Sequence, residues 1–79
     1  SGGDMSNIND EIIDILTPVI GFGLARTAVS TQCKKMGILP EELSEKNILE
    51  FSERFEKILA IFAGEEVALT ITHRINSLK

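Results

Sequence analysis

Three interruptions in the helical pattern limit what this chain can fold into. Pro18, the stretch from Gly37 to Pro40, and Gly64 separate four segments in which apolar residues recur three or four positions apart. Proline and glycine commonly mark helix boundaries, because proline lacks a backbone donor and glycine adopts left-handed backbone angles. Each segment has one apolar stripe that must be buried against its neighbours. The sequence therefore predicts an all-α fold, a small four-helix bundle with short connections.

The first interruption has two interpretations. Thr17 followed by Pro18 fits a helix cap and the first residue of a new helix. On this interpretation a short first helix ends near Leu16, and a second helix runs from Pro18 to about Met36. The alternative is a first helix that continues into the second through a kink at Pro18. We favour the break.

The second half of the chain is expected to form two further helices. Residues 40–43 are predicted to make one helical turn, and Ser44 to cap a helix that ends near Ala63. Gly64 stops that helix, and Glu65 opens the last one, where an acidic side chain suits the positive end of the helix dipole.

Length and cysteine content bound the domain organisation. The 79 residues have room for one core, so we expect residues 1–6 to be a disordered tag or linker and residues 7–79 to be a single helical domain. One cysteine excludes an internal disulfide. Cys33 and His73 supply only two of the four ligands that a structural zinc site needs. We therefore expect no metal and no cofactor, and the small core favours oligomerisation.

Charge argues against nucleic-acid and membrane partners. The net charge of −4 predicts a surface that repels phosphate backbones and anionic lipid. A DNA-reading third helix and its flanks would carry eight acidic and three basic residues between Glu41 and Glu66. No segment reaches the roughly 18 apolar residues of a membrane span. Together with a single free thiol, these features predict a cytoplasmic protein without nucleic-acid binding or membrane insertion.

No pattern of residues predicts catalysis. Cys33 lies on an apolar stripe near the end of its helix, where the helix dipole disfavours a thiolate, and we expect it to be buried. His73 falls on the opposite side of its helix from Val67, Ile71 and Ile75, and we expect it to be exposed. The two side chains face different environments and are not expected to form a nucleophile–base pair. We expect that the protein is not an enzyme.

Several apolar residues lie outside the main stripe of their helices, on more than one helix. A chain this small has little capacity to wrap a second apolar surface by itself. The leading hypothesis is a protein–protein interaction and assembly module that self-associates, with a homodimer favoured and another protein as the other kind of partner. The residues predicted to lie in the interface are Ile20, Leu24, Leu49, Ile61, Leu69 and His73.

Two other functions remain open at this point. The alternative is a carrier of a small molecule or lipid, which would hold its ligand in an apolar cleft. The cleft would be lined by Phe22, Met36, Phe51, Phe55 and Phe62. A helix–turn–helix-like regulator is the third hypothesis, against which the acidic third helix argues.

Overall fold

The computed structural model describes residues 8–78, whose regular structure is entirely helical. The elements are α1 (Ile8–Ile20), α2 (Phe22–Lys35), a 3-10 turn η1 (Pro40–Glu42), α3 (Ile48–Ala63) and α4 (Glu65–Asn76). The prediction of a small all-α fold with four helices is confirmed. The predicted tag or linker at residues 1–6, and residues 7 and 79 at the two ends of the predicted domain, lie outside the described residues.

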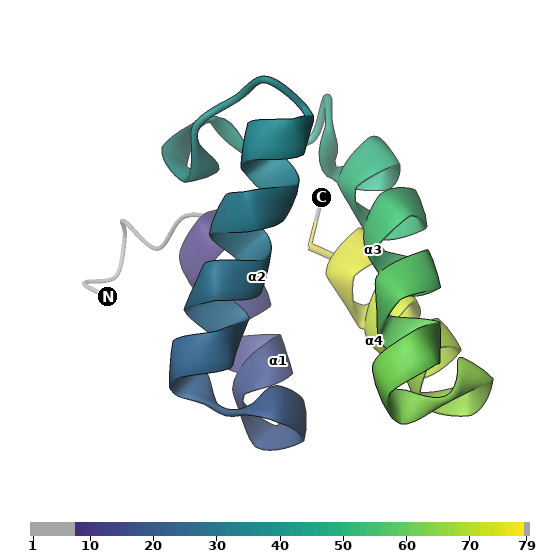
Figure 1. Cartoon of the computed structure of the whole chain (residues 1–79). Coiled ribbons are helices and arrows are strands. Elements are labelled where there is room, and N and C mark those ends of the chain that lie inside the picture. The colour runs from purple at the N-terminus through teal and green to yellow at the C-terminus, as the bar shows by residue number, and fades with distance from the viewer. Residues whose placement is uncertain (1–7, 79) are drawn as a thin grey trace.

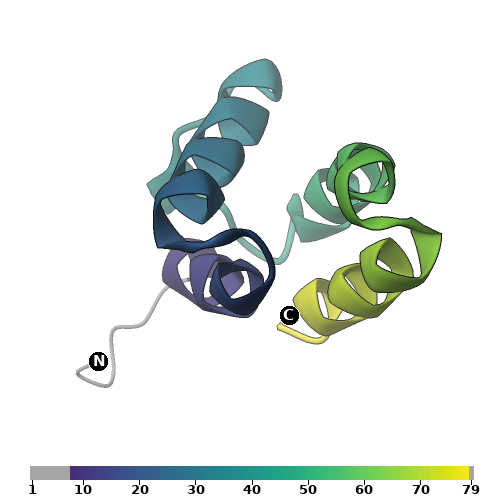
Figure 2. The same ribbon diagram turned by 60° about the horizontal axis from the view of Figure 1, so that its bottom comes forward.

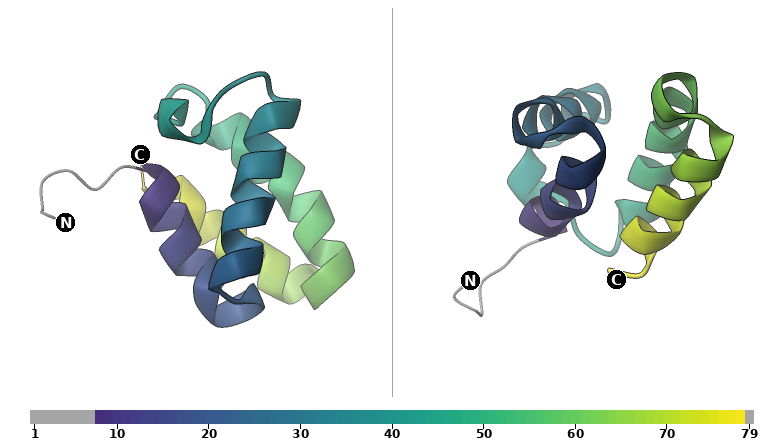
Figure 3. Two further views of the ribbon diagram at one scale, coloured as in Figure 1. Left: turned by 60° about the vertical axis from the view of Figure 1, so that its left-hand side comes forward. Right: turned by 90° about the horizontal axis from the view of Figure 1, so that it is seen from below.

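The helices form two hairpins, α1 with α2 and α3 with α4 (Figure 1). Within each hairpin the two helices pack closely, whereas contacts between the hairpins are sparse. Seen from below, α2 and α3 form one layer and α1 and α4 form the other (Figure 3). Figure 2 shows the same separation of the two hairpins from another direction. Each layer therefore joins the two hairpins through few contacts.

The break between the first two helices lies four residues later than the predicted one. The predicted short helix ending near residue 16 is wrong, because α1 continues through Pro18 to Ile20. Pro18 has no N–H to donate to the Asp14 carbonyl, but α1 continues for two more residues and the Gly21 N–H donates to the Thr17 carbonyl at 2.9 Å. Gly21 then reverses the chain with a φ of 89°, which glycine adopts most easily. α1 and α2 are therefore separate helices that fold back on each other, and α2 begins at Phe22 instead of Pro18.

The end of α2 follows the prediction. Gly37 has a φ of 79°, and the Ile38 N–H donates to the Cys33 carbonyl at 3.0 Å across the end of the helix. The predicted helical turn after it is present as η1, and Leu43 is buried behind it. The connector therefore closes the upper end of the bundle in Figure 1 with an apolar anchor.

The start of α3 differs from the prediction, which placed the cap at Ser44. Asn47 precedes the first helical residue, Ile48. The Ser44 N–H donates to Asn47 Oδ1 at 2.8 Å, and the Asn47 N–H donates to the Ser44 carbonyl at 3.1 Å. These two bonds close a separate turn over residues 44–47, so that the helix begins only after it.

Gly64 alone separates α3 from α4, as predicted. Its φ of 94° and ψ of 159° lie in a region that is essentially restricted to glycine. Its N–H donates to the Ala60 carbonyl and its own carbonyl accepts from the Ala68 N–H, both at 3.0 Å. Gly64 thus provides a backbone hydrogen bond to the last turn of α3 and another to the first turn of α4.

The core is a single apolar cluster to which all four helices contribute. A partly buried polar contact accompanies it: the Ser52 Oγ lies 2.8 Å from Asn76 Oδ1 and links α3 to α4. No helix in the described part of the chain combines the length and apolarity that crossing a membrane requires. The buried apolar residues are Ile12, Ile13, Leu16, Ala25, Val29, Cys33, Leu43, Ile48, Phe51, Phe55, Leu59, Ala68, Ile71 and Ile75.

Candidate docking groove between α2 and α3

An apolar groove lies between α2 and α3 at the end of the bundle where α1 turns into α2. It encloses about 90 Å³, and apolar side chains alone line it. Two helices supply most of the lining, with a contribution from the last residue of α1. The lining residues are Ile20, Leu24, Ala28, Phe55, Ile58, Leu59 and Phe62.

Helical spacing explains how these side chains come together. Leu24 and Ala28 are one turn apart on α2, so both point to the same side of the helix. On α3, positions 55, 58, 59 and 62 share a side for the same reason. The turn at Gly21 places Ile20 beside the start of α2. Because α2 and α3 make few contacts with each other, the facing sides remain partly uncovered.

The groove has a buried floor and an exposed rim. Phe55 and Leu59 form the floor, with 2% and 1% of their surfaces exposed, and the Phe55 ring stacks on the core residue Phe51 at 5.4 Å between centroids. Leu24 and Phe62 form the rim, with 55% and 74% exposed. The neighbouring residue Ile61 is 84% exposed and lies one turn beyond Ile58. The apolar surface thus continues from the groove onto the outside of α3.

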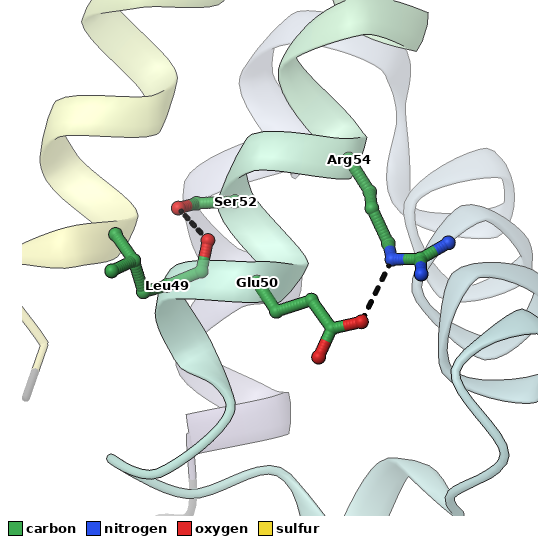
Figure 4. Close-up of polar contacts among 4 residues, drawn as sticks. All are labelled: Leu49, Glu50, Ser52 and Arg54. Atoms are coloured by element: carbon green, nitrogen blue, oxygen red, sulfur yellow. Dashed lines mark hydrogen bonds and ion pairs between the residues drawn. The ribbon is translucent and has the colours of Figure 1, made fainter.

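The opposite end of the α2–α3 layer is charged. Lys34 and Lys35 occupy the last turn of α2. On α3, the Arg54 Nε donates to Glu50 Oε2 at 3.0 Å, and both side chains are about half exposed. Figure 4 shows this pair on the side of α3 away from α4. Such an exposed pair contributes only a few tenths of a kcal/mol to stability. It extends from the first turn of α3 to the residue that precedes Phe55 of the groove.

The residues predicted to form an interface divide into two groups. Ile20 and Leu24 line the groove, and Ile61 extends its rim. Leu49, Leu69 and His73 are exposed on α3 and α4 but are not part of the groove lining. In Figure 4, Leu49 points to the side of α3 nearer α4, whereas Arg54 points away from it. Of the six predicted interface residues, the structure therefore brings only Ile20, Leu24 and Ile61 to the groove or its edge.

The five residues of the predicted cleft do not line one cavity. Phe55 and Phe62 border the groove, whereas Phe51 is fully buried in the core and Met36 packs partly buried against it. Phe22 lies elsewhere, on the solvent side of α2, where the Arg26 guanidinium carbon sits 5.8 Å from its ring centroid. The sequence analysis did not assign the groove residues Ala28, Ile58 and Leu59 to any site. The spacing Phe55–Leu59–Phe62 continues the stripe of α3 and was the signal available for Leu59.

The only thiol of the chain is placed for packing. Cys33 is fully buried on α2, as predicted. Burial raises the pKa of its thiol to about 11, and Glu41 adds to the rise through its negative charge. The thiol is therefore protonated at neutral pH. Among residues 8–78, no three His, Cys, Asp or Glu side chains gather closely enough to hold a metal ion.

Comparisons with known proteins do not assign the chain to a family. No protein-family model matches it, and neither the curated proteins nor the solved structures include a match.

Proposed function

We propose that this helical domain is a protein–protein assembly module that self-associates, and that a second copy of the chain covers the groove between α2 and α3. One observation carries the proposal: an apolar groove has an apolar floor and exposed rim residues, Leu24 and Phe62, and Ile61, the neighbour of Phe62 in the sequence, is exposed as well. An exposed contiguous apolar patch on a small protein typically marks an interaction site.

The size of the groove favours a protein partner over a small molecule. Sites for drug-sized ligands usually enclose about 300–1,000 Å³ and bury most of the ligand. The groove encloses about 90 Å³, which is room for one or two inserted side chains. A partner that inserts an apolar residue and covers the rim fits this geometry better than a lipid or cofactor held in a closed pocket.

The area of exposed apolar surface fits a modest dimer interface. From their exposed fractions, the groove and Ile61 present roughly 350 Å² of apolar side chain, taking about 100 Å² for an aliphatic side chain and about 200 Å² for Phe. The core of an interface is about 65% apolar, so the patch implies about 550 Å² buried on each copy. This is at the low end of specific interfaces, so we expect a dimer that dissociates on dilution.

Sedimentation velocity over a wide concentration range tests the proposal. The wild-type protein should shift from monomer to dimer as its concentration rises, and Leu24→Asp should hold it as a monomer. Leu69→Asp is the matched control, because Leu69 is 58% exposed, close to the 55% of Leu24, but lies on α4 outside the groove. A wild-type monomer at millimolar concentration would overturn the proposal, as would equal loss of the dimer in both variants.

A further inference from the structure

The α2–α3 layer has two unlike ends, which restricts how two copies can meet. Figures 1 and 3 show α2 and α3 running in opposite directions, so the start of α2 lies near the end of α3. The groove and its rim occupy that end, which we call the apolar end. The other end, which we call the charged end, carries Lys34, Lys35, Lys46 and Glu50, and Arg54, the partner of Glu50, directly precedes the groove residue Phe55.

Two twofold arrangements bring the grooves of two copies together. If the axis runs along the helices, the layers overlap over their whole length, and the charged end of one copy covers the charged end of the other. If the axis runs across the helices at the level of the groove, only the apolar ends overlap, and the charged ends point in opposite directions. Both are closed, self-complementary dimers, which is the usual form of small homo-oligomers.

The distribution of charge and area distinguishes the two arrangements. Full overlap would take the lysines and the Glu50–Arg54 pair partly out of water, and interface cores are depleted in charged residues because their desolvation is costly. Overlap at the apolar ends leaves Lys34, Lys35 and Glu50 hydrated. It also matches the area available, since the exposed apolar residues Leu24, Ile61 and Phe62 are confined to that end.

We infer that the chain forms an end-overlapping twofold dimer, in which the Leu24 and Phe62 rims of two copies cover each other and the charged ends lie far apart. The inference rests on the proposed self-association and specifies its geometry. In this dimer α2 of one copy crosses the apolar end of α2 of the other, and Phe62 is close to the groove of the second copy.

A distance between two spin labels at the charged end tests the geometry. Lys46 is exposed in the turn before α3, and the variant Lys46→Cys can be labelled selectively because Cys33 is fully buried. With a rise of 1.5 Å per helical residue and helices packed at 8–10 Å, labels on two copies should lie roughly 35 Å apart in the end-overlapping dimer. Full overlap would bring them to below about 20 Å.

A charge variant gives an independent measurement. Lys34→Glu with Lys35→Glu should change the dimer dissociation constant by less than about twofold, because both side chains stay hydrated and beyond a Debye length of the partner's charged end. Leu24→Asp should raise the constant at least a hundredfold. A wild-type monomer would overturn self-association itself. Suppose instead that the wild type dimerises and Leu24→Asp abolishes the dimer. Labels less than about 20 Å apart, or a tenfold change in the dissociation constant of the lysine variant, would then overturn only the end-overlapping geometry.

Discussion

Two phenylalanines on the same helix should respond in opposite ways to the same truncation. Phe51 and Phe62 lie three turns apart on α3, and both belong to the apolar pattern of that helix. Phe51 has no exposed surface, whereas Phe62 is 74% exposed at the rim of the groove. We predict that Phe51→Ala mainly destabilises the fold and that Phe62→Ala mainly weakens association.

The magnitudes follow from burial. Truncating a buried Phe typically costs 3–5 kcal/mol, about half of the roughly 4–12 kcal/mol of unfolding free energy expected for 79 residues. For Phe62 only about a quarter of some 200 Å² is covered in the monomer, so truncation removes about 50 Å² and costs about 1.3 kcal/mol. If a second copy covers the remaining surface, each copy loses up to about 3.7 kcal/mol of association free energy.

Urea unfolding followed by far-ultraviolet circular dichroism measures the first effect, since the chain has no Trp or Tyr to serve as a fluorescent probe. The measurement should be made at low protein concentration, because association adds to apparent stability by mass action. Sedimentation then measures the second effect on the same variants. Equal losses of monomer stability in Phe51→Ala and Phe62→Ala would refute the reasoning, because they would mean that Phe62 is covered within one copy.

Three further predictions concern the fold. Gly64→Ala should lower the unfolding free energy by about 1–3 kcal/mol, because the φ of 94° at this position strains any other residue. Gly23→Ala should raise it by about 0.5–1 kcal/mol, because Gly23 is helical and has open space around it. Urea midpoints of the two variants that move in the same direction would contradict this. Because the folded pKa of Cys33 is raised from 9.0 to about 11, its stabilising contribution is complete below pH 9 and is lost as the pH rises toward 11. Unfolding free energy should fall by on the order of 2–3 kcal/mol over that window in wild type, and much less in Cys33→Ala. Ser52→Ala should cost about 1 kcal/mol through the bond to Asn76, and adding Asn76→Ala should cost little more, which a double-mutant cycle in urea would check.

The sequence predicted the number of helices and most of their ends, but it misplaced the boundary between α1 and α2. Glycines at 37 and 64 marked real helix ends because their backbone angles exclude most other residues. Pro18 misled because proline favours the first turn of a helix, whereas here it lies in the last turn of α1 and Gly21, three residues on, makes the turn. Taking Gly21 instead of Pro18 as the marker of the helix boundary would have placed this boundary correctly.

The stripe of α3 shows why the groove was predictable only in part. Its apolar spacing from Ile48 to Phe62 is uniform, and the first half is buried, whereas Ile58 is only partly buried and Phe62 is mostly exposed. Local periodicity identifies which side of a helix faces its neighbours but not how far away the neighbour lies. That distance depends on how the two hairpins meet, and the sparse contacts between them leave the end of the stripe uncovered.

The hairpin arrangement also bears on how the chain reaches its native state. Most close packing joins residues within 8–35 or within 48–76, so the contacts that stabilise the fold are local in sequence. Chains with such low contact order fold within microseconds to milliseconds, because little loop entropy is lost before contacts form. Each hairpin is then expected to form early and the two to dock last. Truncating side chains at the contact between α1 and α4 should accordingly raise the unfolding rate and leave the folding rate nearly unchanged.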